Sequence, residues 1–234
     1  MKDNIQFSLV IPCFNEAKNI PLLLERCKKF SNDNTIEVII VNNGSTDNTN
    51  QVLSELLPLY PNFRKINVKK NIGYGFGIIQ GLKSAKGSVL GWTHADMQTD
   101  PYDFLRGIDF FKQSNKNIFV KGRRYGRPFG DTFFTIGMSI FESILLGTRL
   151  WDINAQPTIF SKSFFHSLKN PPNDFSLDLY FYYKAIQSNL KIYRFPVLFG
   201  ERAHGVSHWN VDFSSKLKFI HRTINYSFKL KKYI

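Results

Sequence analysis

Three short apolar runs, each followed by a polar loop, dominate the first half of the chain. They are Phe7–Pro12, Ile36–Val41 and Ser88–Trp92, and their composition is typical of parallel strands covered on both faces. Apolar residues at helical spacing predict helices over about 19–30 and 50–57, between these runs. Strand, loop and helix in this repeated order predict a βαβ architecture, in which ligands bind beyond the carboxyl ends of the strands.

The pattern continues along the chain. We expect one α/β domain over residues 1–234, with a mostly parallel central sheet flanked by helices and a short antiparallel element before Phe199. A single domain of 234 residues is large enough to bury a substantial core. The strands are expected near residues 7–11, 36–41, 63–68, 88–93, 117–121 and 192–197.

The loop after the third apolar run carries three side chains that suit a divalent cation. His94, Asp96 and Gln98 stand at alternate positions, so an extended chain places them on one face. An imidazole, a carboxylate and an amide oxygen there can hold a cation, and the cation can hold a pyrophosphate. The competing interpretation is a polar turn, with Asp100 and Pro101 starting the next helix.

Three motifs at this edge resemble those of the inverting family 2 glycosyltransferases, which have a GT-A fold. The matching segments are Val10–Glu16, Val41–Asp47 and His94–Gln98. Within the family, the chain looks most like the polyprenyl-phosphate sugar transferases, such as dolichyl-phosphate mannosyltransferase, because Asn71–Gly75 and Gly122–Tyr125 also match that branch. The resemblance implies a GT-A-like, Rossmann-like α/β domain that transfers a hexose from a nucleotide-diphosphate sugar.

The resemblance also assigns roles around the donor. Pro12 and Phe14 would form an apolar wall for the base, whereas Glu16 and Asn43 would hydrogen-bond the base edge or the ribose. The family usually has an Asp pair where this chain has Asn42 and Asn43, so the identity of the base stays open. The set implied for the nucleotide sugar is Pro12, Phe14, Glu16, Asn43, His94, Ala95, Asp96, Arg202 and His208.

The implied metal ligands are Asp96, Gln98 and His94, and Asp96 is counted among the catalytic residues as well. His94 stands where the branch usually has an Asp, and its nitrogen suits Mn²⁺ better than Mg²⁺. The alternative is that His94 only hydrogen-bonds the donor. The expected cofactor is therefore a divalent cation, Mn²⁺ or Mg²⁺. Arg202 and His208 are expected to add positive charge, although His208 also fits a plain surface loop.

The acceptor half matches the branch less well. Arg124 matches a phosphate-contacting arginine, but the second arginine expected on the following helix is missing, and Asp131 and Ile136 stand nearest to its place. The segment Asp152–Pro157 also departs from the branch's pattern. Asp178 is expected to be the catalytic base or an orienting carboxylate, the alternative being a charge that stabilises a helix start. The expected acceptor is a polyprenyl phosphate, with a saccharide or another hydroxyl compound as the alternative.

Two other classes compete with this interpretation. A nucleotidyltransferase would have a Gly-rich, basic first loop to hold a triphosphate, and Pro12–Glu16 has neither feature. A non-catalytic nucleotide-binding relative would explain the altered residues His94 and Asn42. The joint presence of Asp96, Gln98, Asp178 and Arg202 argues against that second class.

The charge of the chain changes the picture of its partners. There are 31 Lys and Arg against 18 Asp and Glu, a net charge of +13, which favours anionic partners. The basic residues form no known nucleic-acid motif, so a nucleotide sugar and an anionic membrane surface are the expected partners. Residues 211–232 predict a basic amphipathic helix, which would lie on a membrane or pack on the domain.

Cysteine content and hydropathy suggest where the protein works. Cys13 and Cys27 show neither a zinc nor a disulfide spacing, and no signal peptide precedes the first strand. The apolar stretch Phe133–Leu146 is interrupted by polar residues and is short for a bilayer span. We therefore expect a cytoplasmic protein, attached peripherally to the membrane, with Phe133–Leu146 and the C-terminal helix closing one side of the cleft.

Overall fold

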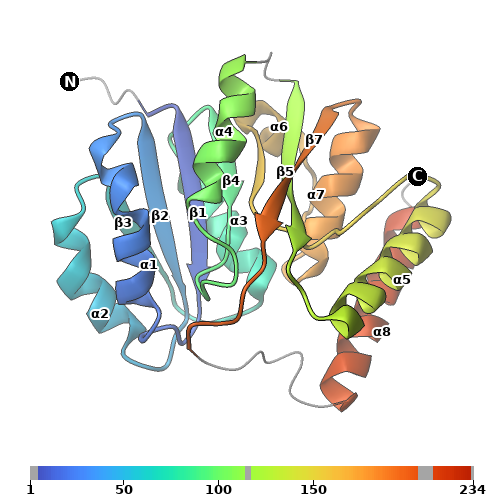
Figure 1. Ribbon diagram of the computed structural model, residues 1–234, viewed down its shortest axis with the longest axis horizontal. Helices are drawn as coiled ribbons and strands as arrows, with labels where there is room; N and C mark the ends of the chain where they lie inside the picture. The colour runs from blue at the N-terminus through green and yellow to red at the C-terminus, as the bar shows by residue number, and fades with distance from the viewer. Residues whose placement is uncertain (1–4, 114–116, 205–212, 233–234) are drawn as a thin grey trace.

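A seven-stranded sheet organises the chain (Figure 1). The computed structural model describes residues 5–113, 117–204 and 213–232, without the side chains of 213–219. The strands follow the order β3-β2-β1-β4-β6-β5-β7, and all neighbours are parallel except the two pairs that contain β6. The strands are β1 (Phe7–Cys13), β2 (Ile36–Asn43), β3 (Phe63–Val68), β4 (Val89–Trp92), β5 (Ile118–Tyr125), β6 (Thr158–Ser161) and β7 (Lys191–Leu198).

Helices cover both faces of this sheet. In Figure 1, α1 and α4 lie in front of the strands and α3, α6 and α7 lie behind them, while α5 and α8 pack together beyond β7. This arrangement confirms the predicted α/β domain with a mostly parallel sheet. The helices are α1 (Ile20–Cys27), α2 (Thr49–Leu56), α3 (Tyr74–Ser84), α4 (Asp103–Gln113), α5 (Phe129–Leu146), α6 (Lys162–Ser167), α7 (Ser176–Gln187) and α8 (Phe213–Lys231).

The core consists of two apolar layers, one on each side of the sheet. Alternate residues of a strand point to opposite faces, so Leu9 and Ile40 join one layer, while Val10 and Val41 join the other. All eight residues of β2 are buried, as expected for a central strand. Helix α3 approaches the sheet closely at Gly81, where a Cβ would stand 2.3 Å from a methyl carbon of Val10.

Two details differ from the sequence prediction. The antiparallel strand is β6, a four-residue strand that the hydrophobic pattern did not reveal because it is so short. The strand directly before Phe199 is β7, which pairs parallel with β5. The predicted C-terminal helix is present as α8, but its fully buried side chains include Ser227, whereas Phe228 of the predicted stripe is 49% exposed.

Candidate active site

The loops after β1 and β2 are fastened to each other at the carboxyl edge of the sheet. The Asn15 backbone lies in the left-handed region, with φ of 57°. Its side-chain oxygen accepts the backbone N–H of Thr46 at 2.8 Å, and its own N–H donates to the Ser45 hydroxyl at 3.1 Å. The resulting bridge holds Pro12 and Phe14, both half-buried, next to the second loop.

Glu16 and Asn43 are both partly engaged within the protein. Asn19 donates to the Glu16 carboxylate, and burial, reinforced by the charge of Asp96, raises the pKa of Glu16. Asn43 is 3% exposed and donates to the Gly73 carbonyl at 3.0 Å, while its side-chain oxygen has no hydrogen-bond partner among the described residues. Asn43 thus fixes the start of α3 and retains one free acceptor.

Asp96 joins the loop after β4 to the loop after β7. One carboxylate oxygen accepts the N–H of Gln98 at 3.1 Å, and the other forms an ion pair with Arg202 at 2.9 Å. The backbone N–H of Gly200 donates to the Gln98 carbonyl at 2.8 Å, which fixes the second loop in place. Asp96 and Arg202, both predicted to bind the nucleotide sugar, are therefore in direct contact. His208, the third such residue in this region, lies outside the described residues.

His94 begins a column of stacked rings. Its ring lies 5.6 Å from that of Tyr74, which in turn stacks on Phe175 at 4.5 Å with an interplanar angle of 10°. Burial lowers the pKa of His94, with the carboxylate of Asp96 opposing that shift. The imidazole is consequently neutral at pH 7, which is the form that binds metals. Ala95, also predicted at this site, is buried between His94 and Asp96.

The residues of this loop supply ligand types that suit a divalent cation, although the Gln98 amide donates to the Gly200 carbonyl at 3.4 Å. Over the described part of the chain, no three His, Cys, Asp or Glu side chains converge as a preformed metal site. A neutral imidazole, a buried carboxylate and an amide oxygen are nevertheless the mixed N/O ligands that suit Mn²⁺. Because Arg202 occupies one oxygen of Asp96, a cation has to displace its guanidinium from that oxygen.

Asp178 is almost completely buried, at 2% exposure, within a polar network. One of its oxygens accepts hydrogen bonds from Lys121 at 3.1 Å and from the Gln156 amide at 2.7 Å. The same amide lies 3.4 Å from the Tyr74 hydroxyl. Asp178 is therefore linked through Gln156 to Tyr74, the middle ring of the stacked column. The sequence analysis missed Lys121 and Gln156, although a lysine ending the apolar run 118–121 was a usable signal.

Two arginines gather around Phe199, beside the end of β5. Asp152 accepts hydrogen bonds from both the backbone and the guanidinium of Arg124, at 2.8 Å each. The guanidinium carbons of Arg124 and Arg127 lie 5.2 and 5.3 Å from the Phe199 ring. Arg127 donates to Thr135 at 2.6 Å, but its Nε has no partner among the described residues. Burial and the neighbouring Arg124 lower the pKa of Arg127. Arg127 precedes α5, and the sequence analysis did not consider it.

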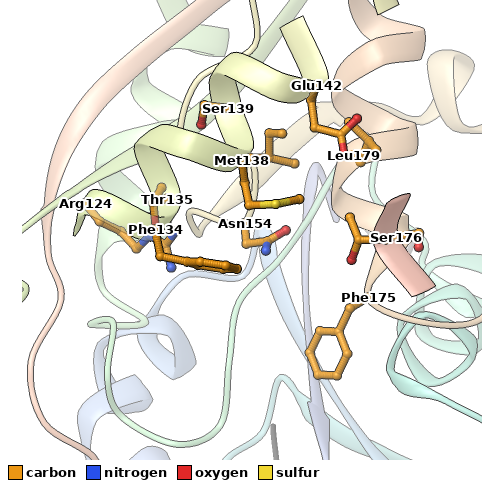
Figure 2. A pocket seen from close by; sticks show the side chains of 12 residues that line it. Arg124, Phe134, Thr135, Met138, Ser139, Glu142, Asn154, Phe175, Ser176 and Leu179 are labelled. Atoms are coloured by element: carbon orange, nitrogen blue, oxygen red, sulfur yellow. The ribbon is translucent and has the colours of Figure 1, made fainter. Parts of the chain in front are cut away.

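A small pocket of about 50 Å³ continues from Arg124 between α5 and α7 (Figure 2). Met138 and Leu179 form apolar walls, and Ser176 and Glu142 add polar groups. Glu142 is fully buried; one oxygen accepts from Ser227 at 2.7 Å, and the other has no partner among the described residues. Burial raises the pKa of Glu142 to about 7.

Comparisons with known proteins identify the family. The family model for glycosyl transferase family 2 matches residues 8–170. This chain belongs to that family. A dolichyl-phosphate beta-glucosyltransferase of Dictyostelium discoideum is 30% identical over 124 residues, which is 49% of this chain and 38% of that protein. One from Trichomonas vaginalis is 31% identical over 133 residues, or 53% and 41% of the two chains. The chain thus matches about two fifths of the length of these relatives.

Solved structures of glycosyltransferases share the fold. Glucosyl-3-phosphoglycerate synthase from Mycobacterium tuberculosis, in complex with Mn²⁺, UDP and its product, has a TM-score of 0.73 at 16% identity, covering 97% of this chain and 80% of that one. A mannosyltransferase from Pyrobaculum calidifontis, with GDP-mannose and Mn²⁺, has a TM-score of 0.68 at 15% identity, covering 96% and 64%. These likenesses confirm the predicted GT-A fold of a family 2 glycosyltransferase.

The first prediction concerns Asp96. In the Asp96→Ala variant we expect Mn²⁺ to lose its effect on UDP affinity, with metal affinity reduced at least about 10-fold, because a buried carboxylate ligand is removed. Isothermal titration calorimetry of UDP with and without Mn²⁺ measures this. The matched control is Asp109→Asn, an exposed carboxylate on α4. Equal binding by Asp96→Ala and the parent would show that this loop holds no metal.

The second prediction concerns Glu142. The pKa of Glu142 is about 7 in the folded protein, against an ordinary 4.5, so the folded protein keeps the Glu142 proton to a higher pH than the unfolded chain does. The contribution of this group to the stability of the folded state is fully present below about pH 4.5 and is lost as the pH rises through about 7. Glu142→Gln should therefore be more stable than the parent at pH 8, by roughly 1–3 kcal/mol, with the difference disappearing near pH 4.5.

Urea denaturation across this pH range measures the effect. Glu55→Gln, a change at an exposed glutamate on α2, is the control and should leave the pH dependence unchanged. A parent protein whose stability is flat between pH 5 and pH 8 would contradict a proton held on Glu142.

Proposed function

We propose that this protein is an inverting glycosyltransferase that moves a sugar from a nucleotide-diphosphate sugar to a polyprenyl phosphate at a membrane surface. Family membership supports the transfer of a sugar. The names of the relatives, dolichyl-phosphate beta-glucosyltransferases, support the acceptor class. The structural observation that carries the acceptor class is the pair Arg124 and Arg127, two guanidinium groups on one ring beside a single paired carboxylate.

The donor occupies the carboxyl edge of the sheet in this proposal. Pro12 and Phe14 flank the base, and the buried oxygen of Asn43 can accept a hydrogen bond from the nucleoside once the Asn43 side chain turns outward. Arg202, on leaving Asp96, stays close enough to neutralise the diphosphate. When bound, a divalent cation held by Asp96, Gln98 and His94 supplies further positive charge for the leaving nucleotide.

The transfer step needs no base when the acceptor is a phosphate. A phosphate oxygen attacks the anomeric carbon from the side opposite the nucleotide, and the bond from that carbon to the leaving oxygen breaks. The electron pair of this bond goes to the diphosphate, and the configuration at the anomeric carbon is inverted. A hydroxyl acceptor would have to lose a proton, for which Asp178 is the candidate base. The ion pair with Lys121 and the hydrogen bond from Gln156 fit an orienting carboxylate, which is the role that a phosphate acceptor leaves to Asp178.

Arg124 and Arg127 bind the acceptor phosphate in this scheme. Asp152 holds the guanidinium of Arg124 in place, and Arg127 adds a second positive charge beside it. Two neighbouring guanidinium groups repel each other, and an anion between them removes that repulsion while accepting charge-assisted hydrogen bonds. Helix α5 begins directly after this pair at Phe129, and Asp131 in its first turn offsets part of the positive end of the helix dipole.

Helix α5 supplies the contact with the membrane. Four of its large apolar side chains face outward: Phe129 is 87% exposed, Phe133 70%, Ile140 52% and Ile144 78%. Their spacing of four, seven and four residues forms one stripe along the helix. Of the helices in the described residues, α5 alone is long and apolar enough to cross a membrane by length and composition, whereas the sequence analysis considered only the shorter stretch from Phe133.

The third prediction tests the acceptor. With Mn²⁺ and a panel of UDP- and GDP-sugars, we expect transfer to a polyprenyl phosphate in detergent. Arg127→Ala should raise the acceptor KM roughly 10- to 100-fold, because a charge-assisted hydrogen bond is lost, and leave the donor KM unchanged. Arg149→Ala, near the other end of α5, is the control.

Other outcomes of this assay would replace the proposal. Transfer to soluble saccharides but never to a polyprenyl phosphate would establish the hydroxyl-acceptor alternative. Binding of nucleotide sugars without any turnover would indicate a non-catalytic relative.

The fourth prediction tests the membrane contact. We expect the parent to cosediment with vesicles of phosphatidylcholine and phosphatidylglycerol at low salt. Replacing Phe133 and Ile144 together by Ser should weaken this partition more than about 10-fold, because each exposed apolar side chain contributes on the order of 1.5–3 kcal/mol on transfer from water. Leu59→Ser removes a side chain that is 72% exposed near the opposite edge of the sheet and should have no effect. A parent that stays in the supernatant would refute the membrane contact.

A further inference from the structure

Lys121 is a charged residue in the interior of the protein. It lies on β5, has no exposed surface, and follows the buried apolar residues 118–120. Its ammonium donates to the Thr158 hydroxyl at 2.7 Å and to the Asp178 carboxylate at 3.1 Å. A buried ion pair of this kind is seldom retained for stability, because an apolar pair of similar size would cost less to bury. A functional role is therefore the better explanation.

The contacts beyond Asp178 lead to the donor site. The Gln156 amide donates to the same Asp178 oxygen at 2.7 Å and lies 3.4 Å from the Tyr74 hydroxyl. The Tyr74 ring stacks on His94, in the loop that carries Asp96. An unbroken series of contacts thus runs from Lys121 to His94, and a buried network of this kind allows little freedom of orientation.

We propose that Lys121 is a positioning residue of the transfer reaction, which holds Asp178 as an orienting carboxylate and, through Gln156 and Tyr74, fixes the His94 side of the donor site. This inference rests on the proposed function and deepens it. Lys121 and Gln156 both donate to the same Asp178 oxygen, Oδ1, and these two hydrogen bonds fix the orientation of the carboxylate.

The charges around Lys121 give the proposal a pH signature. Burial lowers the pKa of Lys121 to about 8; Asp178 on α7 opposes this shift, Arg194 on β7 adds to it, and Asp152 before β6 opposes it. The Tyr74 hydroxyl remains protonated, because burial raises its pKa further. The ammonium is thus present below about pH 8 and is lost above it. Activity should fall as the pH rises through this value.

The experiment is a double-mutant cycle of Lys121→Met, Asp178→Asn and the double variant, with Lys65→Met on the opposite edge strand β3 as the control. The double variant leaves no unpaired charge in the interior and keeps the test valid if Lys121→Met alone does not fold. For each variant, kcat and donor KM are measured from pH 6 to pH 9.5, using the nucleotide sugar that the parent turns over best. Calorimetry of UDP and UDP-glucose is performed in parallel.

We expect Lys121→Met to lower kcat by about 100-fold, the loss that a misplaced reacting group produces, with UDP affinity unchanged. The decline above pH 8 should disappear in both variants that lack Lys121, and the double variant should be no slower than Asp178→Asn. A folded Lys121→Met with parental kcat and pH profile would overturn the proposal, as would losses that multiply in the double variant. A parent without any turnover would instead refute the proposed function. Calorimetry then tests Lys121 separately: a positioning role requires that Lys121→Met binds UDP-glucose more weakly than the parent does, and binds UDP equally well.

Discussion

The burial of both faces of a parallel sheet is the constraint on which the rest of this structure depends. Helices cover the strands on each side, so a polar side chain inside the sheet has to find a partner or lie at a strand end. The loops after β1, β2 and β4 begin at such ends and meet at one edge, which is where Asn15, Asn43 and Asp96 lie. The site is thus a consequence of how the strands are packed.

Three carboxylates around the site are paired with basic side chains, whereas Glu16 and Asp47 accept hydrogen bonds from neutral groups. Asp96 is paired with Arg202, Asp152 with Arg124, and Asp178 with Lys121. Each pair removes one negative charge that would otherwise repel an anionic substrate. Arg194 adds a longer contact to Asp152 at 3.9 Å, and the charges of Asp152 and Asp131 both act on Arg127. The neutralised carboxylates lower the repulsion that an anionic ligand would meet at this edge.

The sequence predicts this fold well where one signal dominates. β2 is apolar along most of its length, as the sequence predicts. The extended alternation expected for His94, Asp96 and Gln98 does not occur, because β4 ends at Trp92 and Met97 has a φ of 62°. Prediction from the sequence fails where the contact that determines the structure joins distant segments. Four residues of β6 are too few to show a period, and the partnership of Lys121 with Asp178 joins positions 57 apart. Arg127 could not be singled out from the sequence, because it lies in the short segment between β5 and α5 and its contact with Phe199 joins distant positions.

The two faces of helix α5 differ in polarity. In a water-soluble helix the apolar stripe faces the core and the polar residues face outward. In α5 the outward stripe contains Phe133 and Ile144, while the inward face buries Ser139 and Glu142. Glu142 satisfies one oxygen through Ser227 of α8, so the two helices are joined by a polar contact under an apolar exterior. An exposed apolar stripe of this kind marks an interaction surface, and the proposed membrane contact would bury it.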